Sequence, residues 1–324
     1  MATIREVARE AGVSVGTVSM VLNNAEYGSQ GIRQKVEAAV EKLHYVPSAI
    51  GRNLSLQCTQ TVGIIVPTVA HPLFSELVEA LEESLHNLGY KAMLCCTQKK
   101  ENPERIFVEM LQQQTMDGII MGAHSLDLSL YENIKRPIIA FDRFLSPDIP
   151  IVHCDHVLGG KLAAEAFLQH DCRHIVEIAA SAEVKLPAGE YHQAFNQIML
   201  EKGVKLDTVT LPWNAFSYRD YLTMAEEIFA SYQDVDGILG SDISVSCCMQ
   251  IALQRGIKVP EQLKLVAYDG TYMTQAGPFR LTAVRQPIEE LAELAAQKMV
   301  ARIKNKEDKL PWILPPKLIL GETC

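Results

Sequence analysis

Hydrophobic positions along the 324-residue chain follow two different patterns, and the change falls near residue 57. The first 45 residues repeat apolar side chains at helical spacing and contain no strand-like run. The remainder alternates β-branched runs with amphipathic stretches of helix length. We therefore expect a small helical domain over 1–57 and a larger α/β domain over 58–324.

Three short helices are predicted at the N-terminus. Thr3 and Glu6 have the spacing of a capping box, and Gly12 permits a tight turn after the first helix. Ser14 can cap a second helix, and a third apolar stripe follows over 32–43. This is a helix-turn-helix pattern, and the second helix leaves these side chains facing outward: Val15, Gly16, Thr17, Ser19 and Met20.

An exposed helix N-terminus with small side chains can enter the major groove of double-stranded DNA. Its amides and hydroxyls then reach phosphates, while its outer side chains reach base edges. The same pattern also fits a three-helix bundle that only packs against another surface.

The larger part repeats a β-α-β rhythm twice, which predicts two similar lobes of doubly wound α/β structure. The sequence DGIIMG at 117–122 has a similar counterpart, DGILGS, at 236–241. A crevice between two such sheets is where a small ligand would bind. The expected strands are 62–66, 91–96, 118–122, 137–141, 150–154, 174–180, 208–211, 236–240 and 263–268, and the expected helices include 72–88, 103–114, 189–202, 218–232 and 243–255.

Composition and charge narrow the possibilities further. The net charge is −9, but residues 1–57 carry six basic and five acidic side chains, so the acidity belongs to the larger part. No apolar run approaches the roughly 20 residues that span a bilayer, so no membrane partner is expected. The eight cysteines have no C-x-x-C spacing, and motifs such as G-x-S-x-G and H-E-x-x-H are absent. These patterns predict a cytoplasmic protein with reduced thiols, no cofactor, no bound metal and no enzymatic activity.

Several sequence segments resemble those of a known protein family. TIREVAREAGVSVGTVSMVLN at 3–23 and KLHYVPSAIGRNL at 42–54 resemble the headpiece and hinge of the lac repressor (LacI/GalR) family of bacterial transcription regulators. VGIIVPTVAHPLFSELVEALE at 62–82, FDR at 141–143 and LTAVRQP at 281–287 are similar to the family's periplasmic-binding-protein-like domain. The run at 110–152 is similar to the sucrose and ribose operon repressors.

The resemblance implies a DNA-binding surface on the headpiece and hinge. Leu54 would be the apolar wedge that enters the minor groove, in a hinge helix that folds on DNA. Many family members carry polar side chains where this chain has Val15, Gly16 and Met20, which favours thymine-methyl contact or shape readout. A passive linker over 47–60 is the alternative. The DNA-binding residues implied are Thr3, Ser14, Val15, Gly16, Thr17, Ser19, Met20, Asn23, Arg52 and Leu54.

The resemblance also implies a small sugar effector bound between the lobes. Tyr191 stands in YHQAF where the family usually has an Arg, so a neutral sugar is favoured over a sugar phosphate. Asp242 or Asp269 could instead cap a helix. The effector-binding residues implied are Phe74, Asp142, Arg143, Tyr191, Trp213, Asp242 and Asp269.

A homodimer is expected, because one headpiece reads only half of a palindromic operator. Three alternatives remain open. The chain could be a global carbon-catabolite regulator whose corepressor is a phosphorylated carrier protein. It could be a sugar-binding transport protein, or an α/β enzyme that acts on a carbohydrate. A transport protein, however, would need an export signal and no headpiece.

Overall fold

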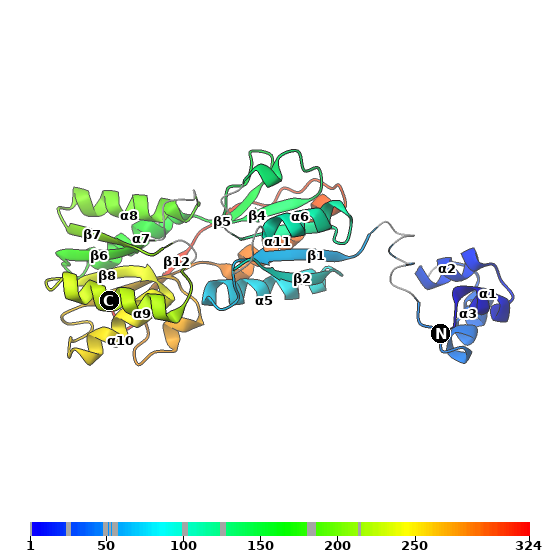
Figure 1. The fold of residues 1–324 in the computed structure, drawn as a ribbon, viewed down its shortest axis with the longest axis horizontal. Helices are drawn as coiled ribbons and strands as arrows, with labels where there is room; N and C mark the ends of the chain where they lie inside the picture. The colour runs from blue at the N-terminus through cyan, green and yellow to red at the C-terminus, as the bar shows by residue number, and fades with distance from the viewer. Residues whose placement is uncertain are drawn as a thin grey trace. The chain divides into compact units, whose positions relative to one another are not determined.

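The computed structural model describes residues 2–23, 27–47, 51, 53, 58–98, 103–123, 128–179, 186–212 and 215–324. The chain divides into two compact units, Met1–Gln60 and Thr61–Cys324 (Figure 1). Residues 54–57 lie outside the described part, so the expected boundary at 57 stays a prediction. No helix within the described ranges is long and apolar enough to cross a membrane.

The first unit is a bundle of three helices, which we call the headpiece. The capping box predicted from Thr3 and Glu6 is present, and Gly12 ends the first helix in the left-handed conformation (φ +68°). Val7, Val18 and Val36 are among the buried side chains of its core, and these apolar side chains pack against the core while remaining partly buried: Leu22, Ile32, Val40 and Leu43. The helices are α1 (Ile4–Ala11), α2 (Val15–Asn23) and α3 (Gln30–Lys42).

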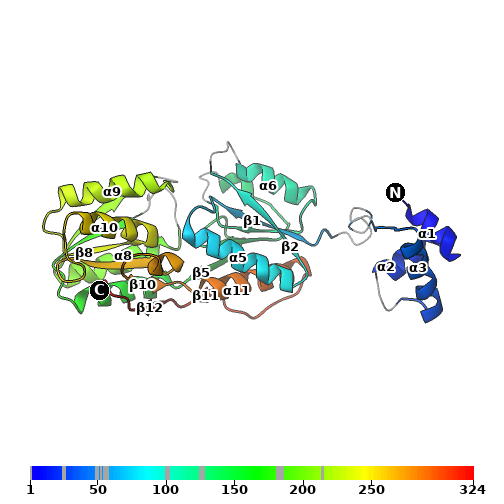
Figure 2. The same ribbon diagram turned by 90° about the horizontal axis from the view of Figure 1, so that it is seen from below.

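The second unit contains two lobes, each built on a six-stranded sheet, as the repeated rhythm predicts. The N-lobe sheet is parallel, with strand order β11-β5-β4-β3-β1-β2. Both faces are covered, with α5 and α11 on one face and α6 with η1 on the other (Figure 2). Its elements are β1 (Thr61–Val66), α5 (Pro72–Asn87), β2 (Lys91–Cys96), α6 (Pro103–Gln112), β3 (Gly118–Met121), η1 (Leu128–Tyr131), β4 (Ile138–Phe141), β5 (Ile151–Cys154), α11 (Ile288–Ile303) and β11 (Ile313–Leu314).

The C-lobe sheet has the order β12-β10-β9-β8-β6-β7 and is parallel except for β12. Helices α9 and α10 pack on one face, and α7 and α8 pack on the other. Strand β7 begins three residues before the expected 208. The elements are α7 (His156–Leu168), β6 (His174–Ala179), α8 (Gly189–Glu201), β7 (Lys205–Thr210), α9 (Tyr218–Ser231), β8 (Gly237–Ser241), α10 (Asp242–Gln254), β9 (Lys264–Asp269), η2 (Tyr272–Gln275), β10 (Thr282–Arg285) and β12 (Lys317–Ile319).

The chain passes between the lobes three times, at 154–156, 285–288 and 314–317. The sequence predicts one strand-like run over 312–320 at the last passage, and this expectation is wrong. Pro315 and Pro316 cannot donate to a ladder, so the run breaks into β11 in one lobe and β12 in the other. Parallel strands of each lobe end beside the crossings, which places the loops after β4 and β9 near the other lobe.

Candidate DNA-binding surface and effector site

The second helix of the headpiece presents the side chains that the sequence analysis singled out. Val15 is 41% exposed and Met20 is 50% exposed, and Gly16 beside them is also exposed. The Ser14 hydroxyl accepts the Thr17 N–H at 3.0 Å and therefore caps the helix. Small and apolar side chains thus form the outer surface at the start of α2.

Other headpiece residues have local partners. Asn23 is exposed at the end of α2, and its amide donates to the Ser19 hydroxyl at 3.3 Å. The Lys42 ammonium lies 2.6 Å from a Glu10 carboxylate oxygen, and both side chains are exposed. That pair neutralises one of the few basic groups. The predicted contacts of Arg52 and Leu54 lie outside the described residues.

An aromatic contact joins the lobes near the start of α5. The rings of Phe74 and Phe216 lie 6.0 Å apart, edge to face, and His71 contacts both. Burial lowers the pKa of His71 to about 4, so its ring is neutral at physiological pH. No sequence signal marks Phe216, and the sequence instead indicates Trp213 as the aromatic partner of Phe74. Trp213 lies outside the described residues.

Acidic side chains converge where the strands end. Burial, more than any other cause, raises the pKa of Asp269 well above its ordinary range, and the charges of Asp242, Asp142 and Glu76 raise it further. The Glu76 carboxylate also accepts the Tyr272 N–H at 2.7 Å, which is a direct bond from α5 to the C-lobe. The structure therefore brings together three of the predicted effector residues and adds Glu76.

Asp242 holds the loop that follows β9. Its carboxylate accepts the Gly270 N–H at 3.1 Å, and the Thr271 N–H and hydroxyl at 2.6 Å each. Burial raises its pKa to about 6 even though these bonds favour the charged form. The sequence also allows Asp242 to cap a helix. In the structure Ser241 is the N-cap of α10, and the Asp242 carboxylate bonds to the loop after β9 instead. Asp269 accepts the Gln286 side-chain amide at 2.9 Å.

Arg143 is fully buried inside the N-lobe. Its guanidinium donates to Glu104 at 3.0 Å and also to the Ala123 carbonyl. Glu104 is 1% exposed, so the positive charge is neutralised within the lobe. Arg143 is therefore enclosed within the N-lobe, whereas its neighbour Asp142 is 19% exposed.

Tyr191 is buried and stacks on Tyr268, with ring centroids 3.8 Å apart and 13° between planes. Burial raises the pKa of the Tyr191 hydroxyl. The ring thus occupies the start of α8, at the position where the family resemblance implies a cation. Tyr268 carried no sequence signal beyond its place at the end of a strand.

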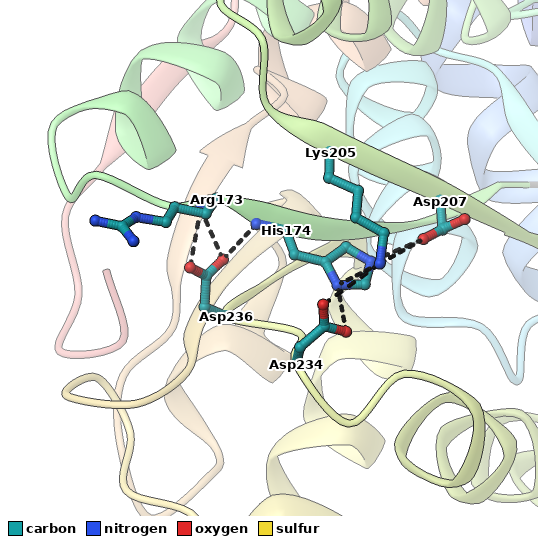
Figure 3. Close-up of polar contacts among 6 residues, drawn as sticks. All are labelled: Arg173, His174, Lys205, Asp207, Asp234 and Asp236. Atoms are coloured by element: carbon teal, nitrogen blue, oxygen red, sulfur yellow. Dashed lines mark hydrogen bonds and ion pairs between the residues drawn. The ribbon is translucent and has the colours of Figure 1, made fainter.

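The buried His174 has carboxylate partners in the C-lobe. The His174 ring lies between two carboxylates, 2.8 Å from Asp234 and 2.7 Å from Asp207, with Lys205 beside it (Figure 3). Asp236 accepts the backbone N–H groups of Arg173 and His174. Within the described ranges, no group of three His, Cys, Asp or Glu residues has the arrangement of a metal site.

A helix-turn-helix unit joined to a two-lobed α/β domain defines a DNA-binding regulator with a ligand-binding module. Comparison with known proteins agrees with this class. Residues 3–48 match the bacterial regulatory proteins of the lacI family, and residues 164–324 match a periplasmic binding protein-like domain. The chain belongs to the LacI family, which consists of transcription regulators and not of enzymes.

Relatives and solved structures match over nearly the whole chain. The sucrose operon repressor of Streptococcus mutans serotype c is 35% identical over 324 residues, covering 100% of this chain and 99% of that protein. The ribose operon repressor of Halalkalibacterium halodurans is 31% identical, covering 100% and 97%. A lac repressor dimer bound to operator and the anti-inducer ONPF has the same fold, with a TM-score of 0.86, 20% identity, and coverage of 99% and 98%.

Proposed function

We propose that the chain is a sequence-specific repressor of a sugar-utilisation operon, released from a palindromic operator by a small sugar. The observation that carries this proposal is the exposed start of α2 on the same chain as a two-lobed domain whose acidic groups converge between the lobes. The names of its relatives, sucrose and ribose operon repressors, support the choice of operon. The protein would act in the cytoplasm, where its operator lies.

On the DNA side, we assign groove contact to Val15, Gly16 and Met20, because these positions are exposed on α2. Apolar side chains cannot make bidentate bonds to base edges, so thymine-methyl contact and DNA shape carry much of the specificity. Leu54 is assigned as the minor-groove wedge by family resemblance. The headpiece and hinge have six basic and five acidic side chains, so non-specific affinity is expected to be low.

On the effector side, we assign sugar contact to the groups between the lobes. Carboxylates accept hydrogen bonds from sugar hydroxyls, and the partly exposed ring of Phe216, which packs against the buried Phe74, offers an apolar surface for the C–H face of a sugar. A phosphate would meet acidic groups here, since Glu104 already neutralises Arg143 and Tyr191 replaces the family's usual Arg. A neutral sugar fits this charge pattern better than a sugar phosphate.

The proposal makes the protein a homodimer, because two headpieces read a palindrome. Sedimentation at micromolar concentration tests this, and a monomer or a stable tetramer would contradict it. Salt-dependent binding of a palindromic duplex, compared with random duplex, tests the DNA-binding role. Leu54→Ala is expected to weaken operator binding strongly and to leave sugar affinity intact.

A thermal-shift panel of free and phosphorylated sugars tests the effector. A ligand at 100 times its Kd stabilises the folded protein by about 2.7 kcal/mol. We expect sucrose, ribose or a close relative to respond, and operator DNA to weaken that sugar's binding by the same factor by which the sugar weakens operator binding. A response only to sugar phosphates would overturn the neutral-sugar assignment. Capture of a phosphorylated carrier protein that raises operator affinity would favour the global regulator instead.

A further inference from the structure

One buried histidine forms hydrogen bonds to both lobes at the first crossing of the chain. His156 is the first residue of α7 and follows β5 by two residues. Its Nε2 lies 2.9 Å from an Asp142 carboxylate oxygen, at the end of β4 in the N-lobe. Its Nδ1 lies 2.9 Å from the Tyr268 hydroxyl, in β9 of the C-lobe. The side chain of His156 is 0% exposed, whereas that of Asp142 is 19% exposed.

The chemistry of the two partners favours one direction for these bonds. An ionised carboxylate only accepts hydrogen bonds, so Nε2 carries the proton that points to Asp142. Burial raises the pKa of Tyr268 well above its ordinary value, so the phenol keeps its proton. The Tyr268 hydroxyl can then donate to Nδ1. A ring that donates from Nε2 and accepts at Nδ1 therefore satisfies both contacts.

The surroundings hold each member of this chain in place. Tyr191 stacks on the ring of Tyr268, and Gly159 leaves room for the hydroxyl, because a Cβ there would overlap it. Asp142 has a left-handed backbone (φ +50°), a conformation that Asp adopts more readily than most residues. The Asp142 carboxylate is thus aimed by its partner and by its own backbone.

We infer that His156 is a positioning residue that joins the lobes and sets the orientation of Asp142 toward a ligand between them. Nothing in the predicted site or in the family resemblance assigns this role to His156. Its location at a crossing means that the contact lies close to the hinge, where lobe movement changes distances least. The inference rests on the proposed function only in that Asp142 receives a sugar, and the proton position does not depend on it.

The proton position is tested without any ligand, by long-range ¹H–¹⁵N spectra of protein labelled with ¹⁵N-histidine. His156→Asn identifies the His156 signals by their loss. We expect a proton that resides on Nε2 and exchanges slowly with water, and faster exchange in Tyr268→Phe, which removes only the hydroxyl. An Nδ1–H ring, or an Nε2 proton that exchanges as fast as that of the exposed His170, would overturn the inference.

The positioning role is tested by calorimetric titration with sucrose and with ribose. His156→Gln keeps an amide that can donate to Asp142, whereas the shorter His156→Asn cannot reach it. We expect His156→Asn to weaken binding of the responding sugar at least tenfold, and His156→Gln to stay within threefold of the wild type. Tyr268→Phe keeps the stacked ring and should weaken binding three- to tenfold, which gives a second reading if His156→Asn folds poorly. His170→Asn, the same change at an exposed position just after α7, is the matched control.

The two proposals fail in different ways. Wild-type affinity in His156→Asn would overturn the positioning role and leave the proposed function standing. If the wild type binds neither sugar, the effector assignment fails, and the nitrogen spectra alone decide the assignment of His156.

Discussion

Replacing the buried carboxyl pair Asp242 and Asp269 by asparagine should change how the stability of the effector-binding domain depends on pH. Asp242 is 1% exposed and Asp269 is 7% exposed, and both pKa values are raised, by burial first. Asparagine resembles a protonated carboxyl in shape, so Asp242→Asn/Asp269→Asn imitates the acid form at every pH. The comparison with wild type then isolates the ionisation of the pair.

The size of the effect follows from Asp242. Its pKa rises from 3.8 to about 6 on folding, and such a change corresponds to about 3 kcal/mol between the two protonation states. Because the folded-state pKa is raised, the stabilising contribution is fully present below about pH 4 and is lost as pH rises through about 6. About 2 kcal/mol of this loss should fall between about pH 4.5 and about pH 7.5.

Urea unfolding followed by circular dichroism at several pH values measures the effect. The free energy of unfolding of wild type minus that of the double variant should fall steadily over this range. Carboxylates distant from the pair titrate equally in both proteins, so their contribution cancels in the difference. Asp142 and Glu76 interact with the pair, so the difference reports the ionisation of the pair together with its effect on these two neighbours. A difference that stays constant within about 0.5 kcal/mol, or that grows with pH, would refute the reasoning.

Three further substitutions test the packing. Thr3→Ala removes the capping box of α1 and should lower headpiece stability by about 1 kcal/mol, measured by thermal unfolding, with an unchanged melting temperature as the contradicting result. Gly160→Ala places a Cβ against the Tyr191 carbonyl oxygen where α7 and α8 meet, and should cost about 3 kcal/mol in urea unfolding; a cost below about 1 kcal/mol would show that the helices can separate. Lys298→Met removes the buried ammonium that donates to Asp308 at 2.6 Å. It should lower the free energy of unfolding by about 2 to 3 kcal/mol, which is at or below the usual cost of breaking a buried ion pair because Asp308 is partly exposed. Equal or greater stability would show that the ion pair is replaceable by an apolar side chain.

Local patterns determined much of the headpiece and the strand ladder. The capping box of Thr3 with Glu6 and the turn at Gly12 depend on neighbours within a few residues, and both are present in the structure. The apolar runs of the central strands are equally local, because a strand covered on both faces is apolar at most positions. The sequence segments that resemble the LacI family then identified the class of regulator, which the relatives confirm.

The partners of polar side chains were decided only by the tertiary structure. Arg143 meets Glu104, 39 residues away, and Asp242 meets Thr271, 29 residues away, so no window of sequence contains both members. The sequence marks a charge at the end of a strand but not whether a partner already neutralises it.

The partners of His156 were likewise decided by the tertiary structure, because one follows β4 in the N-lobe and the other lies in β9 of the C-lobe. Hydrophobic periodicity records which side of an element is buried, whereas a buried hydrogen bond depends on atoms placed within about 3 Å by the packing of distant elements. The sequence therefore determined the elements and the class of protein, and the tertiary structure alone decided which charged groups are free to meet a ligand.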